Sequence, residues 1–196
     1  MKQILFFLCF FVSVSVCAAM ETPTQYIQKT VDSVISVLTD DRYAATEAQD
    51  EKYVQLAQIV DTFFDAQELS RRALGQYWRL FDARQQAEFQ TLFLELIKQV
   101  YLKKSITYSG EKVMYNQEFL KSESLAEVAT TLVANNTNTS IIYYMTRPAP
   151  TTPWKVYDVS VENVSLIKNY RSQFQSILQN NPPEKLLAIL REKTNE

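Results

Sequence analysis

The first half of the chain places apolar side chains three and four residues apart, which is the spacing of one face of an α-helix. This pattern predicts helices over 23–38, 50–64 and 65–74, and a longer helix over 83–101 with the richest apolar face. Each helix has one apolar stripe, so each is expected to pack on a shared core rather than to stand alone.

Residues with helix-start and helix-stop chemistry lie at the ends of these segments. Thr22 precedes Pro23, and Asp82 is followed three residues later by Gln85, a capping-box pattern. Gly75 is expected to end the third helix. Thr22 and Asp82 predict the helix starts because their side chains can bond the backbone N–H groups that have no partner inside a helix.

After Gly110 the period changes from helical to alternating, which is typical of strands. Turn-forming residues fill 135–138 and 148–153, so the last three strands are expected to form an antiparallel meander. Ser165 then caps a helix over 166–178, and a last helix begins after Pro183. The predicted strands span 112–115, 126–134, 140–146 and 154–161.

This order predicts the α+β class: N-terminal helices, a four-stranded mainly antiparallel sheet and C-terminal helices. A curved sheet that faces a helical layer can enclose an apolar cavity, and we expect one between the two layers. Hydrophobic periodicity does not distinguish such a cavity from a filled core.

The N-terminus has the pattern of a secretory signal peptide, with Lys2, an apolar run and then Cys17-Ala18-Ala19. We expect cleavage after Ala19, export, and a single mature domain over 20–196. Cleavage would remove both cysteines, Cys9 and Cys17, and the chain contains no histidine. A disulfide, a Cys/His metal site and a histidine base are then unavailable.

The remaining composition excludes other classes. Removing Lys2 from the 20 basic residues leaves 19 against 22 acidic ones, so no nucleic-acid partner is expected. The two glycines of the chain do not form a P-loop or dinucleotide fingerprint. Paired carboxylates remain as candidate acid/base groups: Asp61 with Asp65, which are better explained as helix-end residues, and Asp158 with Glu162.

Asp158 is the stronger of these candidates because it lies within an apolar strand. The alternation places it on one face with Val156, and Val159 on the other face. A partly buried carboxylate needs a partner, so we expect a structural role for Asp158, as an ion pair with an arginine such as Arg71, Arg72 or Arg171 or as a hydrogen-bond acceptor. Direct contact with a ligand is the alternative.

Residues 154–174, WKVYDVSVENVSLIKNYRSQF, resemble the strand-to-helix segment of the MlaC family of periplasmic phospholipid carriers. Residues 60–79 are similar to the family's F-D-F and R-x-x-L-G-x-x-W run, and 85–93 to its Q-x-x-x-F-x-x-x-F helix. One position departs from the family: Asn163 stands where glycine is usual. Asparagine tolerates positive φ best after glycine, so we expect the turn to be kept.

The resemblance implies a periplasmic phospholipid-binding protein with lipid as cargo, no cofactor and no catalytic step. It implies two partners: an outer-membrane lipoprotein complex, and an inner-membrane ABC transporter complex with its membrane-anchored substrate-binding subunit. Such a carrier would maintain outer-membrane lipid asymmetry. Arg171 is the candidate for the head group or entrance. The candidate acyl-chain contacts are Phe63, Phe64, Leu69, Leu74, Trp78, Phe89, Phe93, Leu96, Ile97, Tyr143, Met145, Val156, Val159, Val164, Ile167, Tyr170 and Phe174.

Two alternatives stay open at this level. One is an enzyme of the cone-shaped α+β kind that uses a carboxylate and a tyrosine on a small apolar substrate. The other is a non-catalytic interaction module with a filled core. A cavity, or its absence, separates the lipid carrier from the second alternative.

Overall fold

The computed structural model describes residues 20–102, 110–134 and 137–195. The expected signal peptide, 1–19, and part of the expected turn at 135–138 lie outside these residues. The elements, in chain order, are α1 (Pro23–Leu38), η1 (Asp41–Tyr43), η2 (Thr46–Ala48), α2 (Gln49–Phe63), α3 (Ala66–Leu74), η3 (Gly75–Leu80), α4 (Ala83–Leu102), β1 (Lys112–Ser122), β2 (Leu125–Ala134), β3 (Thr137–Thr146), β4 (Lys155–Val161), β5 (Val164–Ser165), α5 (Leu166–Leu178) and α6 (Pro183–Thr194).

The predicted helix starts are confirmed by their hydrogen bonds. Thr22 and Gln25 exchange a capping box at the start of α1, with N···O distances of 2.9 and 3.2 Å. Asp82 and Gln85 do the same before α4, at 2.8 and 3.0 Å. Ser165 caps α5 by accepting from the backbone N–H of Lys168 at 3.0 Å. These bonds satisfy backbone N–H groups that lack a partner inside each helix.

The strands form one antiparallel meander in the order β1-β2-β3-β4-β5, so the α+β class is confirmed with five strands instead of four. β1 continues to Ser122, beyond the predicted end at 115, because its ladder with β2 holds it although residues 116–122 are exposed. β5 is a short extra strand. It follows a two-residue turn in which Glu162 and Asn163 have φ of 49° and 65°, so the expected positive φ at Asn163 is confirmed.

A β-bulge changes which side chains of β4 face the helices. Val159 pairs with Tyr143 and Val156 pairs with Met145, with the irregularity between them. Paired residues share a face, so Val156 and Val159 lie on the same face of the sheet. The prediction that they lie on opposite faces is therefore wrong, because the alternation assumed an uninterrupted strand.

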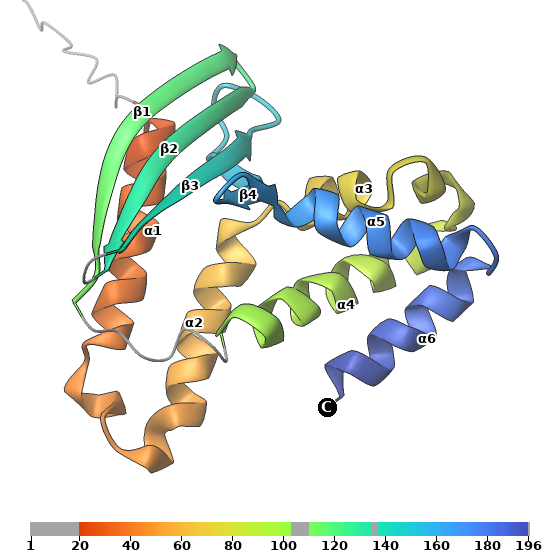
Figure 1. The fold of residues 1–196 in the computed structure, drawn as a ribbon, viewed down its shortest axis with the longest axis horizontal. Helices are drawn as coiled ribbons and strands as arrows, with labels where there is room; N and C mark the ends of the chain where they lie inside the picture. The colour runs from red at the N-terminus through yellow and green to blue at the C-terminus, as the bar shows by residue number, and fades with distance from the viewer. Residues whose placement is uncertain (1–19, 103–109, 135–136, 196) are drawn as a thin grey trace, which may run out of the picture.

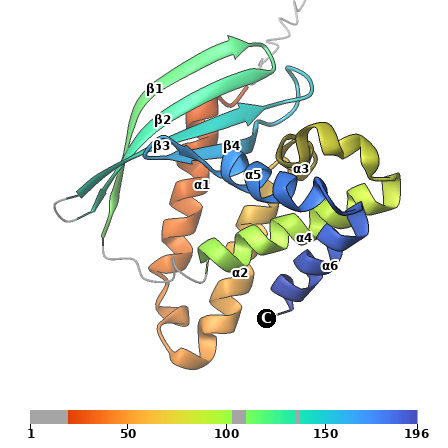
Figure 2. The same cartoon turned by 45° about the vertical axis from the view of Figure 1, so that its right-hand side comes forward.

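Figures 1 and 2 show the sheet curving over the N-terminal part of α1, while α3, α4, α5 and α6 form a helical group beside it. The centre of this group is aromatic: the Phe93 ring lies 5.0 Å from Tyr170, 5.2 Å from Phe174 and 5.5 Å from Phe89, centroid to centroid. α1 and α2 form a hairpin that connects the helical group to the concave face of the sheet. Among the described residues, no helix combines the length and apolarity that a membrane span requires.

Candidate functional site

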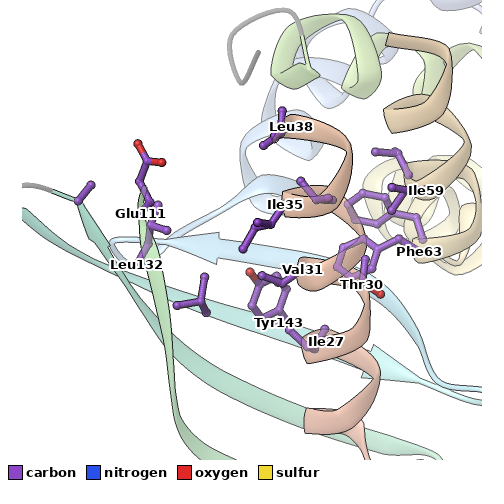
Figure 3. A pocket seen from close by; sticks show the side chains of 15 residues that line it. Ile27, Thr30, Val31, Ile35, Leu38, Ile59, Phe63, Glu111, Leu132 and Tyr143 are labelled. Atoms are coloured by element: carbon purple, nitrogen blue, oxygen red, sulfur yellow. The ribbon is translucent and has the colours of Figure 1, made fainter. Parts of the chain in front are cut away.

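An apolar pocket of about 480 Å³ lies between α1, α2 and the concave face of the sheet; we call it the α1 pocket. Figure 3 shows side chains of α1 pointing toward Tyr143 and Leu132 of the sheet, with Ile59 and Phe63 closing the pocket from α2. Its lining consists of Ile27, Thr30, Val31, Val34, Ile35, Leu38, Ile59, Val60, Phe63, Phe64, Glu111, Val113, Leu132, Ala134 and Tyr143.

The few polar groups of the α1 pocket do not place a charge at its apolar centre. The Glu111 carboxylate points away from the labelled apolar side chains (Figure 3). Burial raises the pKa of Tyr143, although a hydrogen bond with Thr130 opposes the rise. The Tyr143 phenol is therefore neutral at physiological pH, and the pocket wall is suited to hydrocarbon.

A second apolar pocket, of about 500 Å³, lies between α2, α4, β4 and the start of α5; we call it the α4 pocket. Val60 and Phe64 line both pockets, so these two side chains form the wall that the pockets share. The lining of the α4 pocket consists of Val60, Phe64, Ile97, Lys98, Tyr101, Leu102, Val159, Val161, Val164, Ser165, Leu166 and Asn169.

Apolar side chains surround the α4 pocket on its outer side as well. Tyr101, Val161 and Val164 are 47%, 43% and 61% exposed, and all three line this pocket. Val161 and Val164 pair directly across the β4–β5 turn. The pocket therefore has an apolar rim that reaches solvent.

Lys98 contributes the one charged side chain of the α4 pocket among the described residues. Its Nζ lies 2.8 Å from the Glu95 carboxylate and 3.0 Å from that of Asp61, and its side chain is 13% exposed. Burial opposes ionisation, but the hydrogen bonds and charges of Glu95 and Asp61 raise the pKa of Lys98. This cluster connects α4 to α2 beside the pocket.

The candidate acyl-chain contacts fall into two groups. Phe63 and Tyr143 line the α1 pocket, Phe64 lines both, and Ile97, Val159 and Val164 line the α4 pocket. The other candidates are absent from the described lining of both pockets and form the packed core or, for Trp78, pack against it. Contact with a ligand stays a prediction for all candidates. Those outside the two linings are Leu69, Leu74, Trp78, Phe89, Phe93, Leu96, Met145, Val156, Ile167, Tyr170 and Phe174.

α1 forms a wall of the site, although none of its residues was among the predicted site residues. Ile27 is fully buried, yet Val31, Val34, Ile35 and Leu38 further along the same stripe are only partly buried, because they face the α1 pocket. The stripe itself was visible in the sequence. The change from buried to partly open along it has no signal in the hydrophobic pattern, which is the same for a core and for a pocket wall.

Arg171 lies in a separate, basic hollow of about 450 Å³ that is formed by α3, η3 and α5. Its Nε donates to the Arg72 carbonyl at 2.8 Å, and its Nη2 donates to the same oxygen. Gly75, with φ of 55°, lies beside this guanidinium. Arg71 and Arg72 line the same hollow, and both pair with Glu68. The structure therefore separates Arg171 from the described linings of both apolar pockets.

Asp158 has the expected structural role as a hydrogen-bond acceptor, and the alternative of an ion pair is not seen, because no arginine pairs with it among the described residues. Its carboxylate accepts from the Ser165 hydroxyl at 2.6 Å and from the Ile167 backbone N–H at 3.0 Å. The carboxylate thus serves the N-terminal turn of α5, where the helix dipole favours negative charge. It is also absent from the described lining of either pocket, so the acid/base role considered for it has no geometric support.

Metal chemistry has no visible basis in the described part of the chain. No cluster of three or more Asp, Glu, His or Cys side chains with metal-binding geometry occurs in residues 20–102, 110–134 and 137–195. The arrangement that the described residues do offer is two adjoining apolar pockets with few polar groups.

Comparison with known proteins relates this chain to a family model, a named relative and a solved structure. The family model described as MlaC protein matches residues 28–192. The intermembrane phospholipid transport system binding protein MlaC of Haemophilus influenzae is 24% identical over 128 residues, which cover 64% of this chain and 60% of that protein. A solved structure of a phospholipid-binding protein from Ralstonia solanacearum in complex with a phospholipid has a TM-score of 0.74 and 19% identity, covering 87% of this chain and 95% of that one.

Proposed function

Since this chain belongs to the MlaC family, we propose that it is a phospholipid carrier that encloses acyl chains in the α1 and α4 pockets. The family match confirms the resemblance of residues 60–79, 85–93 and 154–174 to the MlaC family. The single observation that carries the proposal is the pair of adjoining apolar pockets that share Val60 and Phe64.

The physical requirement for such a carrier is to keep hydrocarbon out of water. Burying about 30 methylene groups of a phospholipid away from water is favourable by roughly 25 kcal/mol, at about 0.8 kcal/mol each. Two pockets of about 480 and 500 Å³ on either side of one shared wall offer a separate space for each of two chains. A charged head group is best left at the surface, because its burial without partners is costly.

The names of the similar proteins support this reading. The relative from H. influenzae is named as a binding protein of intermembrane phospholipid transport, and the matched R. solanacearum structure holds a phospholipid. These relatives are 24% and 19% identical to this chain, so we propose a phospholipid ligand for it by similarity. The similar fold and the two apolar pockets both favour a phospholipid ligand.

We extend the proposal to the pathway that the family implies. The protein would act in the periplasm and would carry lipid between an outer-membrane lipoprotein complex and an inner-membrane ABC transporter complex with its membrane-anchored substrate-binding subunit. Such exchange would serve to maintain outer-membrane lipid asymmetry. The carrier itself would need no cofactor and no catalytic residue, since the transporter supplies the energy.

Purification from the periplasm without added lipid tests the proposal. We expect solvent extraction of the purified protein to yield phospholipid in a constant molar ratio, and cell fractionation to place the protein in the periplasm. Protein that is repeatedly empty, in preparations whose folding is verified by circular dichroism, would refute lipid carriage.

A further inference from the structure

Lys98 is the only basic residue among the described residues that line the two apolar pockets. It lies on α4, its side chain is 13% exposed, and its neighbours in the lining are Ile97 and Tyr101. A partly buried ammonium group at the edge of a hydrocarbon space is costly unless it is paired. Lys98 is paired, and it also places a cation at the wall of the α4 pocket.

Two carboxylates accompany this cation. Glu95, one helical turn earlier on α4, lies 2.8 Å from the Lys98 ammonium, and Asp61 of α2 lies 3.0 Å from it. Their side chains are 34% and 47% exposed, so both carboxylates also reach solvent. The cluster has one positive and two negative charges and thus an excess of one negative charge. Of the three residues, Lys98 belongs to the described lining of the α4 pocket, and Glu95 and Asp61 lie beside that lining as partners of Lys98. The other described residues of this lining carry no formal charge at physiological pH.

This arrangement matches a head group that carries both signs of charge. A lipid phosphate accepts hydrogen bonds from an ammonium group, and a lipid ammonium donates to carboxylates. An anionic lipid with an uncharged alcohol head group brings a further negative charge to a site that already has an excess of one. Partial burial makes this repulsion larger than it would be in bulk water.

Building on the proposed function, we infer that the Lys98–Glu95–Asp61 cluster selects zwitterionic phospholipids with an ammonium head group over anionic ones. Lys98 contacts the phosphate, and Glu95 and Asp61 attract the ammonium. A bridge that only holds α4 against α2 would leave the choice of head group unchanged. The composition of the bound lipid therefore distinguishes a selective cluster from a purely structural bridge, which stability alone would not do.

Competition between two lipids tests this inference. The purified protein is incubated with vesicles of equal amounts of phosphatidylethanolamine and phosphatidylglycerol, and native mass spectrometry then measures which lipid is bound. The wild-type protein is expected to bind more phosphatidylethanolamine. Asp61→Asn combined with Glu95→Gln turns the cluster from an excess of one negative to one positive charge, and should shift the ratio toward phosphatidylglycerol by a factor of about ten.

Two further variants complete the experiment. Lys98→Met keeps the apolar stem and removes the cation, so the share of phosphatidylglycerol should fall below that of the wild type. Glu47→Gln combined with Asp50→Asn makes the same charge change at exposed positions outside the described linings of both pockets, and should leave the ratio unchanged. Melting temperatures of all variants show whether each protein is folded.

The outcomes separate the two proposals. If every folded protein carries lipid in the same head-group ratio, the cluster is only a structural bridge and the inference is wrong. A shift that is equally large in the Glu47/Asp50 control would assign the effect to net charge and would also overturn it. If no folded protein binds either lipid, the proposed function itself fails.

Discussion

Phe64 and Val156 lie side by side as an isolated parallel bridge, and the backbone N–H of Asp65 donates to the Val156 carbonyl at 2.8 Å. This bridge fastens the junction of α2 and α3 to β4. Because Phe64 lines both apolar pockets, the bridge fixes the backbone of their shared wall to the sheet. The Phe63 ring, 5.0 Å from that of Phe64, supports it from the α1 pocket.

Truncating this wall should be costly in the lipid-free protein. Phe64→Ala is expected to lower the free energy of unfolding by about 3–5 kcal/mol, the usual range for a buried phenylalanine. A bound acyl chain would fill part of the new space, so the loss should be smaller in lipid-loaded protein. Urea unfolding with and without lipid measures both values. Phe119→Ala on exposed β1 is the matched control and should change the free energy by about 0.5 kcal/mol or less.

Replacing the buried carboxylate of β4 should affect stability and not lipid binding. Asp158→Asn weakens the acceptor for Ser165 and Ile167, and is expected to cost about 1–3 kcal/mol of unfolding free energy. Ser165→Ala removes one of these bonds together with the helix cap and should cost about 1–2 kcal/mol. Chemical denaturation checks the size of both effects. Loss of bound lipid from folded Asp158→Asn protein would show that the carboxylate has a direct role in the site.

The turn between β4 and β5 should accept glycine but not alanine. Asn163 has φ of 65°, a region that alanine enters at a cost of roughly 1–2 kcal/mol and glycine enters freely. Asn163→Gly is therefore expected to melt close to the wild type, and Asn163→Ala several degrees lower. Equal melting of the two variants would mean that the left-handed conformation is not required there.

Stability below neutral pH should depend on Glu68. Burial favours the neutral acid, but hydrogen bonds and charges of Arg71 and Arg72 lower the pKa of Glu68 below its ordinary value of 4.5. A carboxylate with a lowered pKa in the folded state stabilises the fold above the unfolded-state pKa. This contribution is lost as the pH falls through the folded-state value. In Glu68→Gln protein the decline of stability below about pH 4.5 should be shallower. An identical pH profile would contradict the assignment; thermal unfolding between pH 2 and 7 measures it.

The predictable part of the fold was local. Thr22, Asp82 and Ser165 mark helix starts because their side chains bond nearby backbone groups, and Asn163 marks a turn because few residues tolerate its φ. The end of β1 was missed because residues 116–122 are all exposed and have no buried face, so that only pairing with β2 defines them as a strand.

The site was harder to predict than the fold. The bulge in β4 reverses the alternation between Val156 and Val159, and it arises from the register with β3, which is not encoded in either strand alone. Likewise, Phe93 in the core and Phe63 in the α1 pocket belong to similar helical stripes. What separates a filled space from an open one is the distance between packed elements, and this depends on the whole tertiary structure.

Filling the pockets is the most direct test of the claim that they hold acyl chains. Val34→Trp fills the α1 pocket, Val159→Trp fills the α4 pocket, and Val37→Trp is the control on α1 outside both described linings. Native mass spectrometry of the purified proteins measures bound phospholipid per chain. The wild type and Val37→Trp are expected to retain lipid, while Val34→Trp and Val159→Trp, folded by circular dichroism, are expected to lose most of it. Wild-type amounts of lipid in both filled variants would contradict the claim.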